Sequence, residues 1–180
     1  YKNLLLQSFN ADVAFNEVFN APKVEIYGDQ LDIIFRPSET DQLNLTVGYL
    51  HARSKSLPLG LQPFEGLMLQ YSPTWTVSAG YHHDFRLNAG YIRARVDTRY
   101  ESHFWGDFRH TFGTRQQSYT KTDASLTYYS DDGGWSFGGW IKNIENEAVI
   151  AAAAGGGLPG PALVGLEAPR TYGVRAGMNF

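Results

Sequence analysis

The stretch from Phe104 to Phe112 holds the residues of this sequence that are best suited to recognising a ligand. It places aromatic side chains next to Arg109 and His110. Rigid aromatic rings supply contact area, and an arginine recognises anionic groups. Trp105, Phe108, Arg109 and His110 are therefore the candidate ligand contacts. The alternative, which we favour, is that the same side chains pack their loop against its neighbours.

A second candidate is the group formed by Arg93, Arg95 and Arg99. All three have odd numbers, so on a β-strand they lie on one face. If that strand crosses a membrane, a cation facing lipid costs roughly 2–4 kcal/mol at the midplane. We therefore expect the three arginines to face the lumen of a barrel or to lie above the membrane. There they pair with carboxylates or line a path for an anionic solute, and we favour pairing.

Catalytic and metal-binding patterns are missing from the sequence. His82 and His83 are neighbours, so on a strand their side chains point to opposite faces and cannot easily share a metal. There is no G-x-S-x-G, Walker or H-E-x-x-H motif, and there is no cysteine for thiol chemistry. The net charge is −3 and no basic run occurs. We expect no enzyme activity, no metal, no cofactor and no nucleic-acid partner.

The elements that position these residues are β-strands, because apolar and polar side chains alternate along the chain. Every odd residue in 43–49 and every even residue in 172–180 is apolar, and the residues between are polar or small. A soluble β-sandwich would show the same alternation. We expect eight strands, at about 1–10, 22–36, 42–56, 66–84, 86–104, 117–130, 134–149 and 169–180.

The lengths of the connections favour a membrane barrel. Short turns are expected at 37–41, 83–86 and 131–134, and long connections at 10–21, 57–65, 105–116 and 151–168. Short turns at one rim and long loops at the other are typical of an outer-membrane barrel. Aromatic residues near the strand ends suit its interfacial girdles; they are Trp75, Tyr81, Tyr91, Tyr128, Trp135 and Tyr172. We predict an all-β, antiparallel, up-and-down transmembrane barrel fold, with a periplasmic C-terminus and extracellular long loops.

Four segments resemble TonB-dependent outer-membrane receptors. The end of the chain, 168–180, resembles the closing strand of these receptors, and 135–147 resembles the strand before it. Upstream, 71–76 is similar to a strand that begins "aP-x-W-t", and 27–32 is similar to an "x-G-x-E-L-E" segment. The resemblance implies a 22-stranded barrel filled by an N-terminal plug. With about eight strands and no plug, residues 1–180 are expected to form one domain, the C-terminal part of such a barrel.

The resemblance also implies a function and a set of partners. Such receptors take up a scarce nutrient, for example a ferric siderophore, in the outer membrane of Gram-negative bacteria. The expected partners are outer-membrane lipid, the barrel-assembly machinery, the plug and remaining strands, TonB acting through the plug, and the small-molecule nutrient. The alternating apolar residues of the last strand look like the signal for the assembly machinery: Tyr172, Val174, Ala176, Met178 and Phe180.

An independent eight-stranded outer-membrane barrel with a structural or adhesive role is the alternative. Such a barrel would pair its first strand with its last. Pairing of residues 1–9 with residues 172–180 would therefore contradict the receptor hypothesis.

Overall fold

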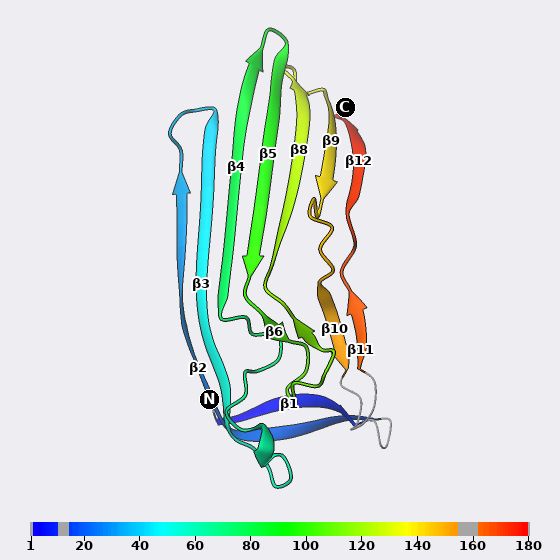
Figure 1. The fold of residues 1–180 in the computed structure, drawn as a ribbon. Coiled ribbons are helices and arrows are strands. Elements are labelled where there is room, and N and C mark those ends of the chain that lie inside the picture. Colours follow the sequence, from blue (N-terminus) through cyan, green and yellow to red (C-terminus); the bar gives the residue numbers. More distant parts are fainter. Residues whose placement is uncertain (1, 11–14, 155–161, 180) are drawn as a thin grey trace.

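The computed structural model of the chain describes residues 2–10, 15–154 and 162–179. Its main element is an eight-stranded antiparallel sheet in which each strand lies beside the next main strand along the chain (Figure 1). The strands are β1 (Lys2–Asn10), β2 (Phe15–Phe35), β3 (Asp41–Ser56), β4 (Trp75–Leu87), β5 (Gly90–Glu101), β8 (Tyr119–Ser130), β9 (Trp135–Lys142) and β12 (Thr171–Met178). The expected all-β, antiparallel, up-and-down architecture is confirmed.

Two small hairpins and one helical turn occupy the connections. The hairpins are β6 (Phe104–Trp105) with β7 (Arg115–Gln116), and β10 (Ile150–Ala154) with β11 (Leu163–Leu166). The helical turn is the 3₁₀ segment η1 (Gln62–Phe64). In the described part of the chain, no helix is both long and apolar enough to cross a membrane.

The sheet does not close on itself. Among the described residues, β1 pairs with β2 and β12 pairs with β9, so β1 and β12 are the two edges of the sheet. An independent barrel would join these edges, because closure removes unpaired backbone groups from a membrane barrel. The eight strands therefore form an open part of a barrel wall and not a complete small barrel.

Strand pairing sorts the side chains into an apolar face and a polar face. Leu45 lies opposite Ala79, and Val96 lies opposite Ala124, so apolar residues on neighbouring strands share one face. Leu126 is 55% exposed on this face, and Val174 is 76% exposed. A broad exposed apolar face suits contact with lipid. The opposite face carries the polar residues that alternate with this set, including Asn44, Thr46, Ser78, Arg95, Asp97, Asp123 and Ser125.

Several predicted boundaries are wrong. The predicted long connection 10–21 is not present, because β2 begins at Phe15 and pairs with β1 from Asn10 onward; residues 11–14 lie outside the described chain. The predicted strand 22–36 begins at Pro22, but Pro22 lies inside β2 beside a register shift between Lys23 and Val24. Prolines are tolerated in strands next to such irregularities.

The β4–β5 and β9 boundaries also differ from the prediction. The predicted turn 83–86 lies within β4, and the chain turns at residues 88–89. Residues 66–74 form a loop, because Gly66 and Tyr71 adopt positive φ, which ends a strand. Asn143 has a φ of 55° and ends β9 seven residues earlier than expected. The connections predicted at 57–65, 105–116 and 151–168 are therefore longer than the sequence indicated, and β4 and β5 are shorter.

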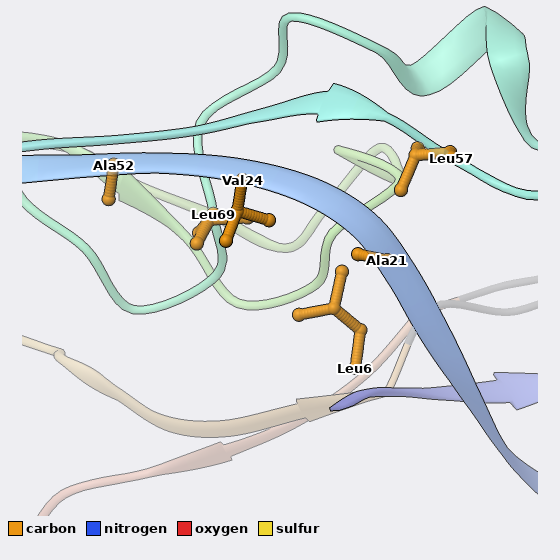
Figure 2. Close-up of a cluster of buried hydrophobic side chains, with 6 residues drawn as sticks. All are labelled: Leu6, Ala21, Val24, Ala52, Leu57 and Leu69. Atoms are coloured by element: carbon orange, nitrogen blue, oxygen red, sulfur yellow. The ribbon is translucent and has the colours of Figure 1, made fainter. Parts of the chain in front are cut away.

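The long connections lie at one end of the sheet and the short turns at the other (Figure 1). Buried apolar side chains gather at the end with the long connections, where the β1–β2 hairpin lies across the sheet. Figure 2 shows the larger cluster, which consists of Leu6, Ala21, Val24, Ala52, Leu57 and Leu69. Phe104, Tyr119 and Val149 form a second cluster. The connections at this end are thus held by cores of the kind found in water-soluble domains.

Candidate functional site

Asp107 organises the loop that was predicted to contact a ligand. Its Oδ1 accepts hydrogen bonds from the Thr111 amide at 2.9 Å and the Thr114 hydroxyl at 2.5 Å. Its Oδ2 accepts a third bond, from the Thr111 hydroxyl, at 2.6 Å. Three bonds to one buried carboxylate fix the loop between β6 and β7. Sequence reasoning missed Asp107, although its spacing from the two threonines is a local signal.

Phe108 and Arg109 lie on the inner side of this loop. Phe108 is 3% exposed, and its ring packs against Phe19 at 5.0 Å and Phe64 at 5.8 Å between centroids. The Arg109 guanidinium lies 5.4 Å from the centre of the Phe108 ring and 5.9 Å from that of Phe64. Its buried Nε has no hydrogen-bond partner in the described part of the chain. Phe108 therefore packs the β1–β2 hairpin, the connection after β3 and the β6–β7 loop together.

Trp105 and His110 form a stacked pair next to that core. Their rings are 4.4 Å apart and 4° from parallel. Arg115 lies 5.9 Å from the centre of the Trp105 ring, and His110 Nε2 is 2.9 Å from the Met68 carbonyl oxygen. Burial lowers the pKa of His110. Of the four predicted ligand contacts, the structure therefore stacks Trp105 on His110 and groups Phe108 with Arg109. Ligand contact by these residues stays a prediction.

The three arginines of β5 all lie on the polar face, and each is paired with a carboxylate. Arg93 forms a two-pronged pair with Asp84, with both N···O distances 2.7 Å. Arg95 binds Asp97 in the same manner, at 2.6 and 2.8 Å. Such paired hydrogen bonds between arginine and a carboxylate are strong and directional. Arg93 therefore links β5 to the neighbouring strand β4, and Arg95 binds a carboxylate of its own strand.

Arg99 connects the wall to a distant loop. It lies 3.4 Å from Glu101 and 3.6 Å from Glu167, and it donates a hydrogen bond of 3.0 Å to the Tyr119 hydroxyl. Glu167 follows β11 and also binds Lys121 on β8 through a short ion pair. The β10–β11 connection is thereby fastened to the polar wall. Sequence reasoning missed Glu167 and Lys121, because they meet only in the folded sheet.

These charges line a cavity of about 510 Å³ on the polar face. Four basic side chains border it (Arg95, Arg99, Lys121 and Lys142), and three acidic ones (Asp97, Asp123 and Glu167). Polar and charged walls of this kind suit a hydrated solute or a polar protein segment better than an apolar ligand. Within the described residues, no three His, Asp or Glu side chains gather in a way that could hold a metal ion.

The closing strand β12 presents its apolar residues on the apolar face. Tyr172 lies opposite Ile141, Val174 opposite Gly139, Ala176 opposite Phe137, and Met178 opposite Trp135. Phe180, the last member of the predicted assembly signal, lies outside the described residues. The described members therefore form one continuous apolar stripe along the edge strand. The role of this stripe in assembly stays a prediction.

The family described as "TonB dependent receptor-like, beta-barrel" matches residues 1–144. Three solved structures share the fold. The ferric yersiniabactin uptake receptor FyuA of Yersinia pestis aligns over 87% of this chain and 24% of its own, with 14% identity and a TM-score of 0.76. BauA of Acinetobacter baumannii, the ferric preacinetobactin receptor, aligns over 96% of this chain and 25% of its own (16% identity, TM-score 0.70).

The siderophore receptor PiuA of Acinetobacter baumannii aligns over 97% of this chain and 24% of its own, with 14% identity and a TM-score of 0.70. This chain thus spans about a quarter of the length of each of the three solved structures. A search of curated proteins gave no significant match.

Proposed function

Because this chain belongs to the TonB-dependent receptor-like β-barrel family, we propose that it forms the C-terminal wall segment of an outer-membrane receptor for a scarce nutrient. The observation that carries the proposal is the open, two-faced sheet. Its apolar face is exposed as lipid contact requires, and its polar face carries paired charges, as a water-filled lumen permits. The sheet ends in an edge strand on each side, β1 and β12, where further strands could extend the wall. The extended wall could then enclose a plug.

The proposed orientation places the C-terminus and the short turns in the periplasm. The long connections then lie outside the cell, where their buried clusters hold them in water. In this orientation the Trp105–His110 stack and Arg109 belong to the extracellular loops, and Arg93, Arg95 and Arg99 face the lumen. Long outer loops and short inner turns are the usual arrangement in such barrels.

A ferric siderophore is the proposed nutrient class. The three solved structures with this fold are named for siderophore uptake or recognition. The loop residues supply stacking surfaces beside cationic side chains, which suits an aromatic or anionic chelate. Nutrient recognition would involve this loop, the polar wall and the plug together.

The remaining partners follow from the same proposal. The polar wall would contact the plug, which would couple the receptor to TonB. The barrel-assembly machinery would recognise the apolar stripe from Tyr172 to Phe180. Deleting Phe180 from the full-length receptor should lower its surface level, and an unchanged level would remove that role.

Uptake measurements test the proposal directly. Cells that lack the full-length receptor are compared with complemented cells for uptake of ⁵⁵Fe from a panel of ferric siderophores. The proposal expects uptake of at least one chelate to depend on both the receptor and TonB. If the protein is folded in the outer membrane but uptake of every chelate is independent of it, the siderophore assignment is contradicted.

A further inference from the structure

The two strands of the β10–β11 hairpin are held in different ways. Strand β10 starts from a buried position, because Val149 and Ile150 are both buried, and the Gln116 side chain accepts a hydrogen bond from the Ile150 amide at 2.9 Å. Among the described residues, β11 pairs only with β10, and its Leu163 and Leu166 side chains are exposed. Strand β11 therefore depends on the contacts that follow it in the chain.

Two side-chain contacts hold the chain directly after β11. The Asn143 amide group donates a hydrogen bond of 3.3 Å to the Ala168 carbonyl oxygen. The Glu167 carboxylate forms the short ion pair with Lys121, and its other oxygen lies 3.6 Å from Arg99. The first contact is neutral and the second is ionic, so only the second can be contested by a charged solute.

The Lys121 ammonium needs an anion at this position. Its side chain is only 17% exposed, and Glu167 is its one carboxylate partner within the described chain. A cation that is largely withdrawn from water is costly unless a counter-charge accompanies it. Glu167 supplies that charge when the cavity holds no other anion.

The cavity of about 510 Å³ beside Glu167 has further groups that suit an anion. Lys142 lines it and has no carboxylate partner among the described residues. On the β3 and β4 side, Thr46 and Ser78 contribute hydroxyl groups to the lining. A volume of this size holds a small solute. One carboxylate of such a solute would take the place of Glu167, and a second would reach Lys142.

We propose that this cavity binds a small solute with two or more carboxylates, and that the solute displaces Glu167 from Lys121 and Arg99. Glu167 is then an internal competitor for the site. Its displacement removes the ionic contact of β11 with the wall, so occupancy of the cavity and the attachment of β11 are coupled. The proposal rests on the proposed function only in placing the polar face against a water-filled lumen.

The coupling has a measurable direction. A solute that competes with Glu167 binds more weakly than its contacts alone would allow, because the cations are free for only part of the time. Removing the competitor should therefore tighten binding. Adding the solute should speed amide exchange in β11, because the solute detaches the strand from the wall.

The purified full-length receptor and the dicarboxylate glutarate test the proposal. Hydrogen exchange is measured across Leu163–Leu166, and the affinity for glutarate is measured by calorimetry. Glutaramide controls for the shape of the probe without its charge. Sodium chloride at equal ionic strength controls for the general screening of ion pairs. Only glutarate should accelerate exchange.

Three variants separate displacement from a general effect of charge. E167Q should exchange fast without glutarate and bind it roughly tenfold more tightly, since the competitor is gone. K121Q should also exchange fast, but it should bind glutarate roughly tenfold more weakly because it lacks a cation of the site. E39Q removes a carboxylate that pairs with Arg86 away from the cavity, and it should behave as the unaltered receptor does.

Two results would overturn the proposal in receptors that are folded in the outer membrane. Glutarate that binds E167Q no more tightly, or that binds without accelerating exchange in the unaltered receptor, would exclude displacement of Glu167. Absence of glutarate binding in all of the proteins would exclude the site. Either result leaves siderophore uptake, which is measured separately, unaffected. A receptor that shows the glutarate response but no uptake would contradict the proposed function alone.

Discussion

The rings of Phe19 and Phe108 lie 5.0 Å apart and join the β1–β2 hairpin to the loop between β6 and β7. Phe64 completes the contact from the connection that follows β3. Three segments that are distant in sequence therefore share one aromatic cluster. A single side chain at its centre should control the stability of this whole end of the molecule.

Substitution Phe108→Ala should loosen the three segments together. Loss of a buried phenylalanine typically costs about 3–5 kcal/mol, because it removes apolar contacts and leaves a cavity. Limited proteolysis of the receptor should then cut these segments much faster. Phe112→Ala is the matched control, because Phe112 is 96% exposed and its loss should change stability by less than about 0.5 kcal/mol. Equal cleavage of both variants would contradict the packing role of Phe108.

Substitution Glu167→Gln should release the β10–β11 connection from the wall. Lys121 would lose its ion-pair partner and Arg99 one of its two carboxylates, at a cost of about 1–3 kcal/mol for a partly buried pair. Hydrogen exchange across Leu163–Leu166 should accelerate, with little change in β4. Glu39→Gln breaks an exposed pair with Arg86 and should leave exchange near the wild-type rate. Unchanged exchange in E167Q would show that the connection is held by other contacts.

Acidification should destabilise the loop that carries His110. Burial lowers the pKa of this histidine, so the folded loop favours the neutral ring. The unfolded histidine titrates near pH 6.5; as pH falls below that value, the unfolded state gains protons first and the folded loop loses stability. The loss is complete once pH is below the lowered pKa. Above about pH 7 the ring is mostly neutral in both the folded and the unfolded state, so the loop keeps its full stability.

Hydrogen exchange around Trp105, measured between pH 8 and pH 5, checks the effect after correction for intrinsic exchange rates. H110Q should remove the dependence, whereas H51Q, which alters the histidine stacked on Tyr27, should keep it. A dependence that persists in H110Q would assign it to another group.

The sequence allowed the two faces of the sheet to be predicted, because a period of two depends only on residue spacing. The odd numbers of Arg93, Arg95 and Arg99 are enough to place them on one strand face. Strand ends were harder to predict. Tyr71 and Asn143 adopt positive φ, and neither residue type predicts this conformation as strongly as glycine does.

The contacts of the candidate site could not be read from the sequence, because they join distant segments. Lys121 and Glu167 are 46 residues apart and meet only when β8 and the β10–β11 connection lie side by side. The burial of Phe108 likewise depends on Phe19, which reaches it because β2 continues past Pro22 to Phe15. The composition of the loop at 104–112 suits both ligand contact and packing, and only the fold places Phe108 in a core.

Substitution Val174→Lys should impair assembly into the outer membrane. Val174 is 76% exposed on the apolar face of β12, so in the proposed barrel its side chain faces lipid. A lysine there costs roughly 2–4 kcal/mol near the midplane, falling toward the interfaces. Ser125→Lys is the matched control, because Ser125 lines the polar face beside Asp123, where a cation can stay hydrated. The fraction of heat-modifiable, folded receptor in outer-membrane extracts should fall for V174K and stay near wild type for S125K. The opposite order would mean that the two faces of the wall have been assigned the wrong way round.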